Sequence, residues 1–523
     1  MSATTLYGWV EVHARRIPER EAAVQGMTRW TYRELQSHTH RWANAFLSAG
    51  VTKGDRVAVL ARPSLDYLAT FLGATAIGAI WVGLNPRYTP EELARVVRDA
   101  APRVLALDLE HSSIGDRLAL DRLLAGLAPI QVISLGTGLP QGGVVPKQVF
   151  LRSGEGAKTG TLEHAITAVA AEDPALLVYT SGTTGSPKGA VISHQALTIC
   201  STYQAARWPV DDMRVLNNLP INHIGCVGDI TCYALACGGT IVFMEQFDPE
   251  GTLRIIQDER LTVWGQVPTM FQLALDHPAR GAYDLTSLRL ALWSGAAASA
   301  ALVERLLEIA PLLATSYGLT ESVGSVTFTE PTRDLQHLAT TVGVVAPHFE
   351  LRLVDEAGAD VPAGALGELL IKGPAMFSGY WQNEAATRAA IDAAGWFHTG
   401  DLATRDAEGA VRVMGRRGDR FKSGGYNIYP REIELVLETH PQVASVAVIG
   451  CTDPLYGEVG EAFIAVHEGA TLTEEQLKAF CREHLANYKV PKRFHLLREL
   501  PMLPIGKVDK QRLKAEVAAL RTH

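Results

Sequence analysis

Segments with helical spacing alternate with short apolar segments over the first 350 residues of the chain. Residues 30–49 have helical spacing, and Thr31 with Glu34 three residues later makes a capping-box pattern at their start. Apolar segments at 56–60 and 104–107 have the length of buried strands. Such β-α-β alternation predicts parallel sheets with helices on both faces. Further elements are predicted as a capped helix at 89–99 and strands at 176–179, 214–219, 239–245 and 262–266.

The stretch from Tyr67 to Pro86 is free of charge for 20 residues, which is roughly the length that crosses a bilayer. Its glycines and Asn85 keep its hydropathy modest. We therefore expect a buried helix at about 64–78 and a strand at about 79–84 rather than a membrane span. The N-terminus carries charges where a signal peptide needs its apolar run, which predicts a cytoplasmic protein.

Two composition changes mark the domain organisation. Residues 136–160 are rich in Gly, Pro and Gln and predict a loop or a subdomain junction, and the short segments of 340–415 predict a β-rich unit. After a basic, Gly-rich stretch, a boundary near 416–420 divides a large domain, 1–417, from a small one, 418–523. The predicted fold class is α/β, with layered α/β subdomains, the β-rich unit and a small α+β domain. In the small domain we expect helices at 430–439 and 473–485 and strands at 443–449, 461–467 and 493–498.

Charge and cysteine usage exclude several protein classes. Fifty-six acidic and 48 basic residues give a net charge of −8, which argues against a nucleic-acid partner. An anionic substrate would need a local basic or amide-rich site. No pair among the six cysteines has CxxC spacing, so a zinc ribbon or dithiol redox centre is not expected. The sequence carries no signal for or against a homo-oligomer.

The strongest local motif is LVYTSGTTGSPKGAVISH, from Leu177 to His194. It places three glycines, six Ser or Thr residues and one lysine directly after an apolar strand. Glycines let the backbone approach an anion, hydroxyls donate hydrogen bonds, and Lys188 adds positive charge, so the motif predicts a polyphosphate site. It is not a Walker A loop, because Pro187 precedes Lys188 and Gly189 follows it.

TSGTTGSPKG resembles the signature of adenylate-forming enzymes: acyl-CoA synthetases, firefly luciferase and the adenylation domains of peptide synthetases. The other motifs of that superfamily follow in its order and extend over residues 30–510. They are LNPRYTPEEL (84–93), LPINHIG (219–225), WSGAAAS (293–299), SYGLTE (316–321), WFHTGD (396–401), GRRGDRFKSGGYNIYPREIE (415–434) and PIGKVDK (504–510).

The resemblance implies an acyl-CoA synthetase that uses ATP, Mg²⁺ and coenzyme A. Attack of a carboxylate on the α-phosphate of ATP would give an acyl-adenylate with a good leaving group, and would need preorganised cations and amide donors. Glu321 would hold Mg²⁺, Thr320 would face the phosphates, and Lys507 would bridge the substrate carboxylate and the α-phosphate. The residues implied to bind ATP are Thr180, Ser181, Gly182, Thr183, Thr184, Gly185, Lys188, Gly295, Ala296, Ala297, Tyr317, Gly318, Asp401 and Arg416.

The family uses a mobile small domain twice, first for adenylation and then, after a rotation, for thiolation. Gly418 stands at the hinge position, where family members usually have Asp or Lys, so a hinge-stabilising salt bridge is in doubt. Glycine is permissive in φ and ψ and still allows a pivot there. The resemblance places coenzyme A on Lys422, Ser423, Gly424, Gly425 and Tyr426.

The acid is a small-molecule carboxylic acid, expected to be fatty or aromatic, because the pocket segments are apolar and Gly-rich. His223 stands where CoA ligases carry a lid residue and where amino-acid-activating members carry Asp. Asp229 is a candidate partner for a cationic acid such as a betaine, with a surface or helix-capping role as the competing interpretation. The predicted acyl pocket is formed by His223, Val227, Gly228, Val267, Gly318 and Val323.

Two alternatives stay open at this point. An enzyme with the same chemistry could load the acyl group onto a separate carrier protein, whose phosphopantetheine arm ends like coenzyme A. A non-catalytic nucleotide-binding regulator is the other alternative. The presence of Glu321, Asp401 and Lys507 argues against it.

Overall fold

The computed structural model describes residues 3–108, 121, 123–124, 130–136, 143–156, 160–180, 187–423, 426–467, 469–503 and 508–521. A seven-stranded sheet comes first, in the order β7-β6-β5-β3-β4-β8-β9. Its strands are parallel except for the antiparallel β8–β9 hairpin. The bounds are β3 (Arg56–Leu60), β4 (Ile80–Leu84), β5 (Val104–Leu107), β6 (Gln131–Ser134), β7 (Val144–Pro146), β8 (Pro174–Thr180) and β9 (Lys188–Ser193).

A nine-stranded sheet has the order β16-β15-β14-β13-β12-β10-β11-β1-β2. Its centre is parallel, whereas β1–β2 at one edge and β14–β15–β16 at the other are antiparallel. The bounds are β1 (Glu21–Gln25), β2 (Thr28–Thr31), β10 (Arg214–Asn217), β11 (Thr240–Phe243), β12 (Val263–Gln266), β13 (Leu290–Trp293), β14 (Leu312–Leu319), β15 (Gly324–Phe328) and β16 (Val344–Val345).

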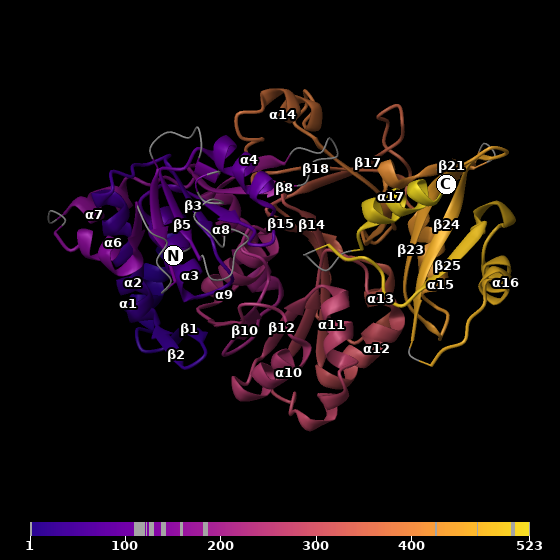
Figure 1. Ribbon diagram of the computed structural model, residues 1–523, viewed down its shortest axis with the longest axis horizontal. Helices are drawn as coiled ribbons and strands as arrows, with labels where there is room; N and C mark the ends of the chain where they lie inside the picture. The colour runs from indigo at the N-terminus through magenta and orange to yellow at the C-terminus, as the bar shows by residue number, and fades with distance from the viewer. Residues whose placement is uncertain are drawn as a thin grey trace.

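Helices lie over both sheets (Figure 1). Every residue of helix α3 except Asp66 is buried, as expected for the charge-free stretch from Tyr67. The bounds are α1 (Leu6–Arg16), α2 (Tyr32–Ser48), α3 (Leu65–Ala76), α4 (Pro90–Ala100), α6 (Lys147–Ser153), α7 (Thr161–Thr167), α8 (His194–Arg207), the π-helix η1 (Gly225–Cys232), α9 (Tyr233–Cys237), α10 (Pro249–Asp258), α11 (Pro268–Leu275), the 3₁₀ helix η2 (Pro278–Ala282), α12 (Ala300–Ile309) and α13 (Leu335–Thr340). In the described parts of the chain, no helix combines the length and apolar character needed to cross a membrane.

The β-rich unit is a four-stranded antiparallel sheet, and the last hundred residues form a five-stranded sheet with its own two apolar clusters (Figure 1). A short 3₁₀ turn, η3 (Arg417–Asp419), joins them. The bounds are β17 (Glu350–Val354), β18 (Gly367–Lys372), α14 (Glu384–Ala390), β19 (Phe397–Arg405), β20 (Val411–Arg416), β21 (Phe421–Ser423), β22 (Tyr426–Ile428), α15 (Pro430–Leu437), β23 (Val443–Asp453), β24 (Gly457–Val466), α16 (Glu474–His484), η4 (Asn487–Lys489), β25 (Arg493–Leu497) and α17 (Lys510–Arg521).

The predicted fold class is confirmed, and one local expectation is wrong. Thr31 and Thr89 cap α2 and α4 in capping boxes, as their spacing indicated. The segment 136–160, expected as a loop, contains β7 and α6 in its described part. Its composition was misleading because β7 is an edge strand. An edge strand pairs on one side only, so it tolerates a residue without an N–H, such as Pro146.

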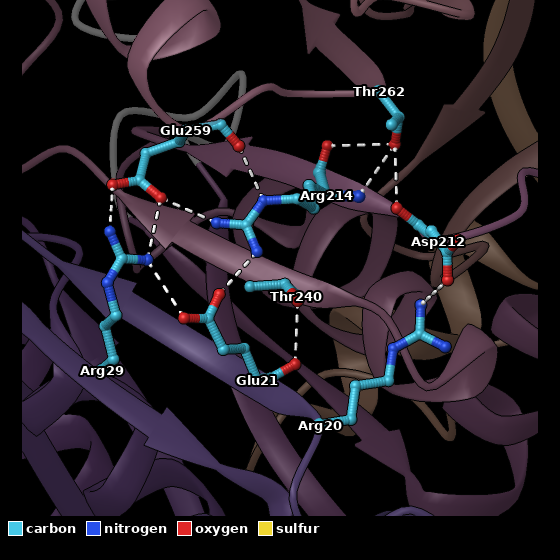
Figure 2. A network of polar contacts seen from close by, with 8 residues as sticks. All are labelled: Arg20, Glu21, Arg29, Asp212, Arg214, Thr240, Glu259 and Thr262. Carbon is cyan, nitrogen blue, oxygen red and sulfur yellow. Dashed lines mark hydrogen bonds and ion pairs between the residues drawn. The ribbon is translucent and has the colours of Figure 1, made fainter.

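An ion-pair network fastens the N-terminal hairpin to the large sheet (Figure 2). Arg214, at the start of β10, contacts Glu21 at 2.6 Å and Glu259 at 2.7 Å. Arg29 on β2 contacts the same two carboxylates, at 3.2 and 2.8 Å. Arg214 therefore connects the starts of β1 and β10 with the turn after α10.

Candidate active site

The turn between β14 and β15 carries Thr320 and Glu321 in a strained backbone. Val323 has a φ of +59°, which β-branched residues rarely adopt. The Leu319 N–H donates to the Ser322 hydroxyl at 2.9 Å, and that hydroxyl lies 2.8 Å from the Gly324 carbonyl. These contacts fix Thr320 and Glu321, both of which are buried. Strain of this kind is typical of functional sites.

Glu321 meets the phosphate motif through Tyr380. The Tyr380 hydroxyl donates to Glu321 Oε1 at 2.8 Å, and Lys188 Nζ lies 5.3 Å from the centre of the Tyr380 ring. A backbone bridge between Ala190 and Tyr380 holds this segment against β9. Burial, and next the Glu321 carboxylate, raises the pKa of Tyr380, so its hydroxyl stays a donor. Lys188 and Glu321, predicted separately, thus share one aromatic neighbour.

A second cluster forms around Asp401. Tyr317 donates to Asp401 Oδ2 at 2.6 Å, and Arg416 Nε–H donates to Oδ1 at 3.0 Å. Asp401 and Arg416 are direct partners across β19 and β20, while Tyr317 comes from β14. Burial and the Asp401 charge raise the pKa of Tyr317, and the same charge raises the pKa of Arg416. The two oriented donors hold the carboxylate in place, which suits recognition of a ribose diol.

The ends of the phosphate motif are paired in the β8–β9 hairpin. Thr180 and Lys188 face each other across its last register position. An antiparallel strand, not a helix N-terminus, therefore follows Lys188, which distinguishes the site from a Walker A loop in structure as well as in sequence. Several predicted site residues lie outside the described residues: Ser181, Gly182, Thr183, Thr184, Gly185, Gly424, Gly425 and Lys507.

Gly295, Ala296 and Ala297 follow the carboxyl end of β13 and are exposed. Gly295 has a φ of +83°, which glycine adopts without strain. Because β13 pairs in parallel with β14, this open segment and Tyr317 lie at the same edge of the sheet. That edge of an open parallel sheet is the usual place for a ligand.

His223 lies just before the π-helix η1, and its Nδ1 accepts the Gly225 N–H at 3.0 Å. The predicted pocket residue Val227 is buried in η1. The space that a side chain would take at Gly318 is filled by the Gly324 carbonyl, 1.8 Å from the ideal Cβ position. At Gly228 the Ile224 side chain lies 3.1 Å from that position. These two glycines therefore allow close packing of the protein itself and do not leave open pocket space.

In the small domain, Lys422 and Ser423 lie on β21 and Tyr426 opens β22. Gly418 lies in η3, where an added Cβ would meet no atom within 4 Å. Ion pairs on either side of it connect to the β-rich unit: Arg417 with Glu368 at 2.9 Å and Arg420 with Glu356 at 2.9 Å. The two neighbouring arginines thus supply the salt bridges that a glycine at the hinge position cannot make.

Tyr380 and Trp381 were not among the predicted site residues. The backbone N–H of Trp381 donates to the Gly189 carbonyl at 2.7 Å, so Tyr380 and Trp381 lie beside the phosphate motif. The signal available was the aromatic pair in SGYWQN, directly after a glycine and within the predicted β-rich unit.

The donor set at Glu321 fits Mg²⁺. Mg²⁺ is held by one or two carboxylates, waters and substrate phosphates rather than by a full protein cage. Glu321 would supply the carboxylate of such a site, and Tyr380 connects it with Lys188 of the phosphate motif. Among the residues that the structure describes, no group of three or more His, Cys, Asp or Glu side chains could hold a metal ion on its own.

Together the fold and these clusters define an adenylate-forming enzyme. The family model "AMP-binding enzyme" matches residues 10–381, and "AMP-binding enzyme C-terminal domain" matches residues 432–507. The chain belongs to the AMP-binding enzyme family, and the predicted membership of the acyl-CoA synthetase class is confirmed.

Relatives match over almost the whole chain. Feruloyl-CoA synthase of Amycolatopsis sp is 36% identical over 516 residues, which cover 98% of each chain. Indoleacetate–CoA ligase of Aromatoleum aromaticum is 33% identical over 512 residues, again covering 98% of each chain. Among solved structures, the amide bond synthetase McbA from Marinactinospora thermotolerans superposes with a TM-score of 0.84 at 29% identity, covering 98% of this chain and 99% of the other.

Proposed function

We propose that the protein is an ATP-dependent ligase that joins an aromatic carboxylic acid to coenzyme A, with AMP and pyrophosphate as the other products. The β14–β15 hairpin is the single observation that carries this proposal. It presents Tyr317 to the ribose-type cluster at Asp401 and Glu321 to the phosphate-type cluster at Tyr380 and Lys188. One rigid element thus provides contacts for both halves of a nucleotide.

The first half-reaction joins the substrate carboxylate to the α-phosphate and releases pyrophosphate. Lys188 and the glycine-rich motif hold the outgoing phosphates, and Asp401 with Arg416 fixes the ribose. Lys507 bridges the carboxylate and the α-phosphate, where negative charge accumulates. Glu321 would hold Mg²⁺, which would supply positive charge beside the phosphates. The second half-reaction transfers the acyl group from AMP to a thiol.

An exposed aromatic surface on the small domain favours coenzyme A as the thiol. Tyr426 is 57% exposed and stacks on Tyr488, with ring centres 4.5 Å apart. Tyr456 is 42% exposed and has Lys492 5.0 Å from its ring centre. Ser423 pairs with both Tyr426 and Gly457, so the two aromatic sites adjoin the predicted thiolation hairpin. Exposed rings with lysines suit an adenine base that carries phosphates.

The names of the relatives support an aromatic acid, since feruloyl-CoA synthase and indoleacetate–CoA ligase are named for aromatic acids. A fatty acid is the competing substrate, and a carrier protein is the competing acceptor. The division into a large domain, 1–417, and a small domain, 418–523, belongs to the same proposal. Two separate apolar clusters in the small unit support it.

The test incubates the protein with ATP, Mg²⁺, coenzyme A and single acids, and identifies the nucleotide products. The panel contains hydroxycinnamic, arylacetic and straight-chain fatty acids. We expect AMP, pyrophosphate and an aryl acyl-CoA. Formation of ADP and phosphate would overturn the reaction class. If the protein catalyses acid-dependent pyrophosphate exchange and acylates an added carrier protein, but forms no acyl-CoA, then the acceptor is a carrier protein and not coenzyme A.

A further inference from the structure

Asp99, near the carboxyl end of α4, is contacted by the phosphate motif and by the aromatic segment beside it. The Tyr179 hydroxyl, at the end of β8, donates to Asp99 Oδ2 at 2.6 Å. The Trp381 indole N–H donates to the backbone carbonyl of Asp99 at 3.2 Å. Tyr179 follows Asp99 by 80 residues and Trp381 follows it by 282. One residue thus connects two parts of the site that are distant in the chain.

These contacts close into a ring at Gly189 on β9. Gly189 is the register partner of Tyr179 in the β8–β9 hairpin, and its carbonyl accepts the backbone N–H of Trp381 at 2.7 Å. The ideal Cβ position of Gly189 lies 3.0 Å from Cζ of Tyr179 and 3.4 Å from Cβ of Trp381. The missing side chain therefore lets the Tyr179 ring lie over Gly189, and such a ring helps to fix the register of the two strands.

The end of α4 that carries Asp99 is anchored to the parallel sheet. Arg56, the first residue of β3, donates from Nε to the Ala100 carbonyl and from a terminal nitrogen to the Ala101 carbonyl, each at 2.7 Å. Carbonyls at the end of a helix lack partners within it, so these bonds stabilise the helix end. Cζ of the same guanidinium lies 5.4 Å from the centre of the Trp381 ring. The position of Asp99 is therefore fixed by the sheet.

The neighbours of this ring of contacts are groups of the candidate active site. Lys188 precedes Gly189, and Tyr380, which donates to Glu321, precedes Trp381. Successive side chains of a strand point to opposite faces, so fixing Gly189 from one face sets the direction of Lys188 on the other. The Lys188 ammonium lies 5.3 Å from the centre of the Tyr380 ring. A change in the ring of contacts would therefore change how Lys188 and Tyr380 lie relative to each other.

Tyr179 and Asp99 differ in burial. Tyr179 is 5% exposed, whereas Asp99 lies at the surface. Burial, and next the hydrogen bond to Asp99, raises the pKa of Tyr179, so its hydroxyl stays a donor. A hydrogen bond to an ionised acceptor is stronger than one between neutral groups. Because Asp99 is exposed, its replacement disturbs no core packing, and an effect on ligand binding can be separated from unfolding.

We propose that Asp99 is a positioning residue for ATP, which holds Tyr179, and through it the β8–β9 hairpin, in the arrangement that presents Lys188 to the phosphates. This inference rests on the proposed function, because it takes the phosphate motif as the place where the β- and γ-phosphates bind. Groups that are held in place before a ligand arrives lose little freedom on binding. The adenosine is assigned to the Asp401 cluster on other elements, so Asp99 should affect the phosphates and not the adenosine.

The test measures the dissociation constants of MgATP and of AMP by isothermal titration calorimetry, without an acid present. Tyr179→Phe keeps the ring and removes the hydroxyl, and Asp99→Leu removes the acceptor. Each should weaken MgATP binding by about 5- to 10-fold, because each removes one hydrogen bond to a charged group. AMP lacks the β- and γ-phosphates, so its binding should stay nearly unchanged. A general loss of structure would weaken the binding of both nucleotides alike.

The variant with both substitutions should bind MgATP as each single variant does, because Tyr179→Phe and Asp99→Leu remove the same hydrogen bond. Asp99→Asn keeps an acceptor oxygen and should restore most of the affinity. Glu91→Leu, at an exposed position on the same helix, is the control and should bind both nucleotides like the parent.

Unchanged MgATP binding in both single variants, or equal losses for MgATP and AMP, would overturn the role of Asp99. So would a double variant in which the two losses multiply, because the residues would then act independently. These measurements need no turnover, which separates them from the test of the proposed function. Release of ADP and phosphate by the parent would overturn the reaction class, while the binding constants would still decide the role of Asp99.

Discussion

At the scale of single residues, the candidate site gains its geometry from partners that are far apart in the chain. Asp401 accepts from Tyr317, 84 residues earlier, and Glu321 accepts from Tyr380, 59 residues later. Each carboxylate is thus oriented by a tyrosine hydroxyl from another element. A pre-oriented carboxylate loses little freedom on binding a nucleotide or a cation, which favours tight and specific binding.

Tyr380→Phe removes the donor to Glu321 and keeps the ring beside Lys188. We expect acid-dependent pyrophosphate exchange to fall by about 10-fold or more at limiting Mg²⁺, because a hydrogen bond to a charged group is worth roughly 1.5–3 kcal/mol. Part of the loss should be recovered at high Mg²⁺. Tyr283→Phe is the matched control, since Tyr283 donates to Glu250 at the same 2.8 Å on α10, away from the site. Equal rates in Tyr380→Phe and its parent would contradict a role for this contact.

Lys507→Ala removes the cation that we assign to the adenylation step. Loss of one charged donor from a preorganised site typically costs roughly 10²–10³ in rate. Acyl-adenylate formation should fall by at least about 10², while thioester formation from supplied acyl-adenylate should stay nearly unchanged. Lys514→Ala on α17 is the control and should affect neither half-reaction. Equal losses in both halves would assign Lys507 to folding or to coenzyme A binding.

At the scale of elements, two hairpins are fixed by opposite means. The β14–β15 hairpin is fixed by close backbone contact, since Gly318 has no room for a Cβ beside the Gly324 carbonyl. The β1–β2 hairpin is fixed by charge, through Arg214 and Arg29 on the carboxylates of Glu21 and Glu259 (Figure 2). The first hairpin carries the site, and the second anchors the N-terminal edge of the sheet.

Arg214→Ala should lower the free energy of unfolding by about 1–3 kcal/mol at pH 7, because it removes one of the two arginine partners of two partly buried carboxylates. Burial raises the pKa of Glu21, but its bonds to Arg214 and Arg29 outweigh this and lower it overall. A carboxylate with a lowered folded-state pKa stabilises the fold above its unfolded-state pKa, and this contribution is lost as pH falls through the folded value. The difference between variant and parent should therefore shrink below about pH 4.

Urea unfolding at pH 7 and pH 3.5 measures this difference. Arg20→Ala is the control, because Arg20 pairs at 3.3 Å with Asp212, whose side chain is 91% exposed. Exposed pairs of this kind contribute roughly 0–1 kcal/mol. A loss of stability in Arg214→Ala that is the same at both pH values would show that packing, and not charge, is what Arg214 contributes.

At the scale of the whole molecule, the small domain is joined to the β-rich unit by η3 and by the ion pair of Arg420 with Glu356. Arg417 and Glu368 form a second pair, but both belong to the large domain, 1–417, so rotation about Gly418 would break only the pair of Arg420 with Glu356. The Glu356 side chain is 77% exposed, so this pair adds little stability. The pair would therefore not hinder the proposed rotation.

Gly418→Pro tests whether this turn is the pivot. Proline locks φ near −65° and lacks an N–H, so it should hold one of the two orientations. We expect pyrophosphate exchange to persist and acyl-CoA formation to collapse. Gly418→Ala is the control and should be nearly neutral, because an added Cβ meets no atom within 4 Å. If Gly418→Pro forms acyl-CoA at the parent rate, then the pivot is not Gly418, and Arg417 and Asp419 are the next candidates.

The sequence by itself determined the features that depend on near neighbours. The capping boxes at Thr31 and Thr89 were predictable because their partners lie three residues away. The strands at 56–60 and 104–107 were predictable from short apolar runs. The motifs predicted the family, because each is a contiguous run of residues. The expected loop at 136–160 was wrong because β7 owes its existence to pairing with β6.

Only the tertiary structure decided which distant groups meet. Tyr380 reaches Glu321 and Arg214 reaches Glu21, 193 residues away, because strand order sets such contacts and local spacing does not record it. Asp229 was visible as a candidate, but its place in a π-helix against Gly324 of the β14–β15 hairpin depends on packing between elements. Hydrogen bonds within an element are fixed by spacing along the chain, whereas contacts between elements are fixed by the packing of the core.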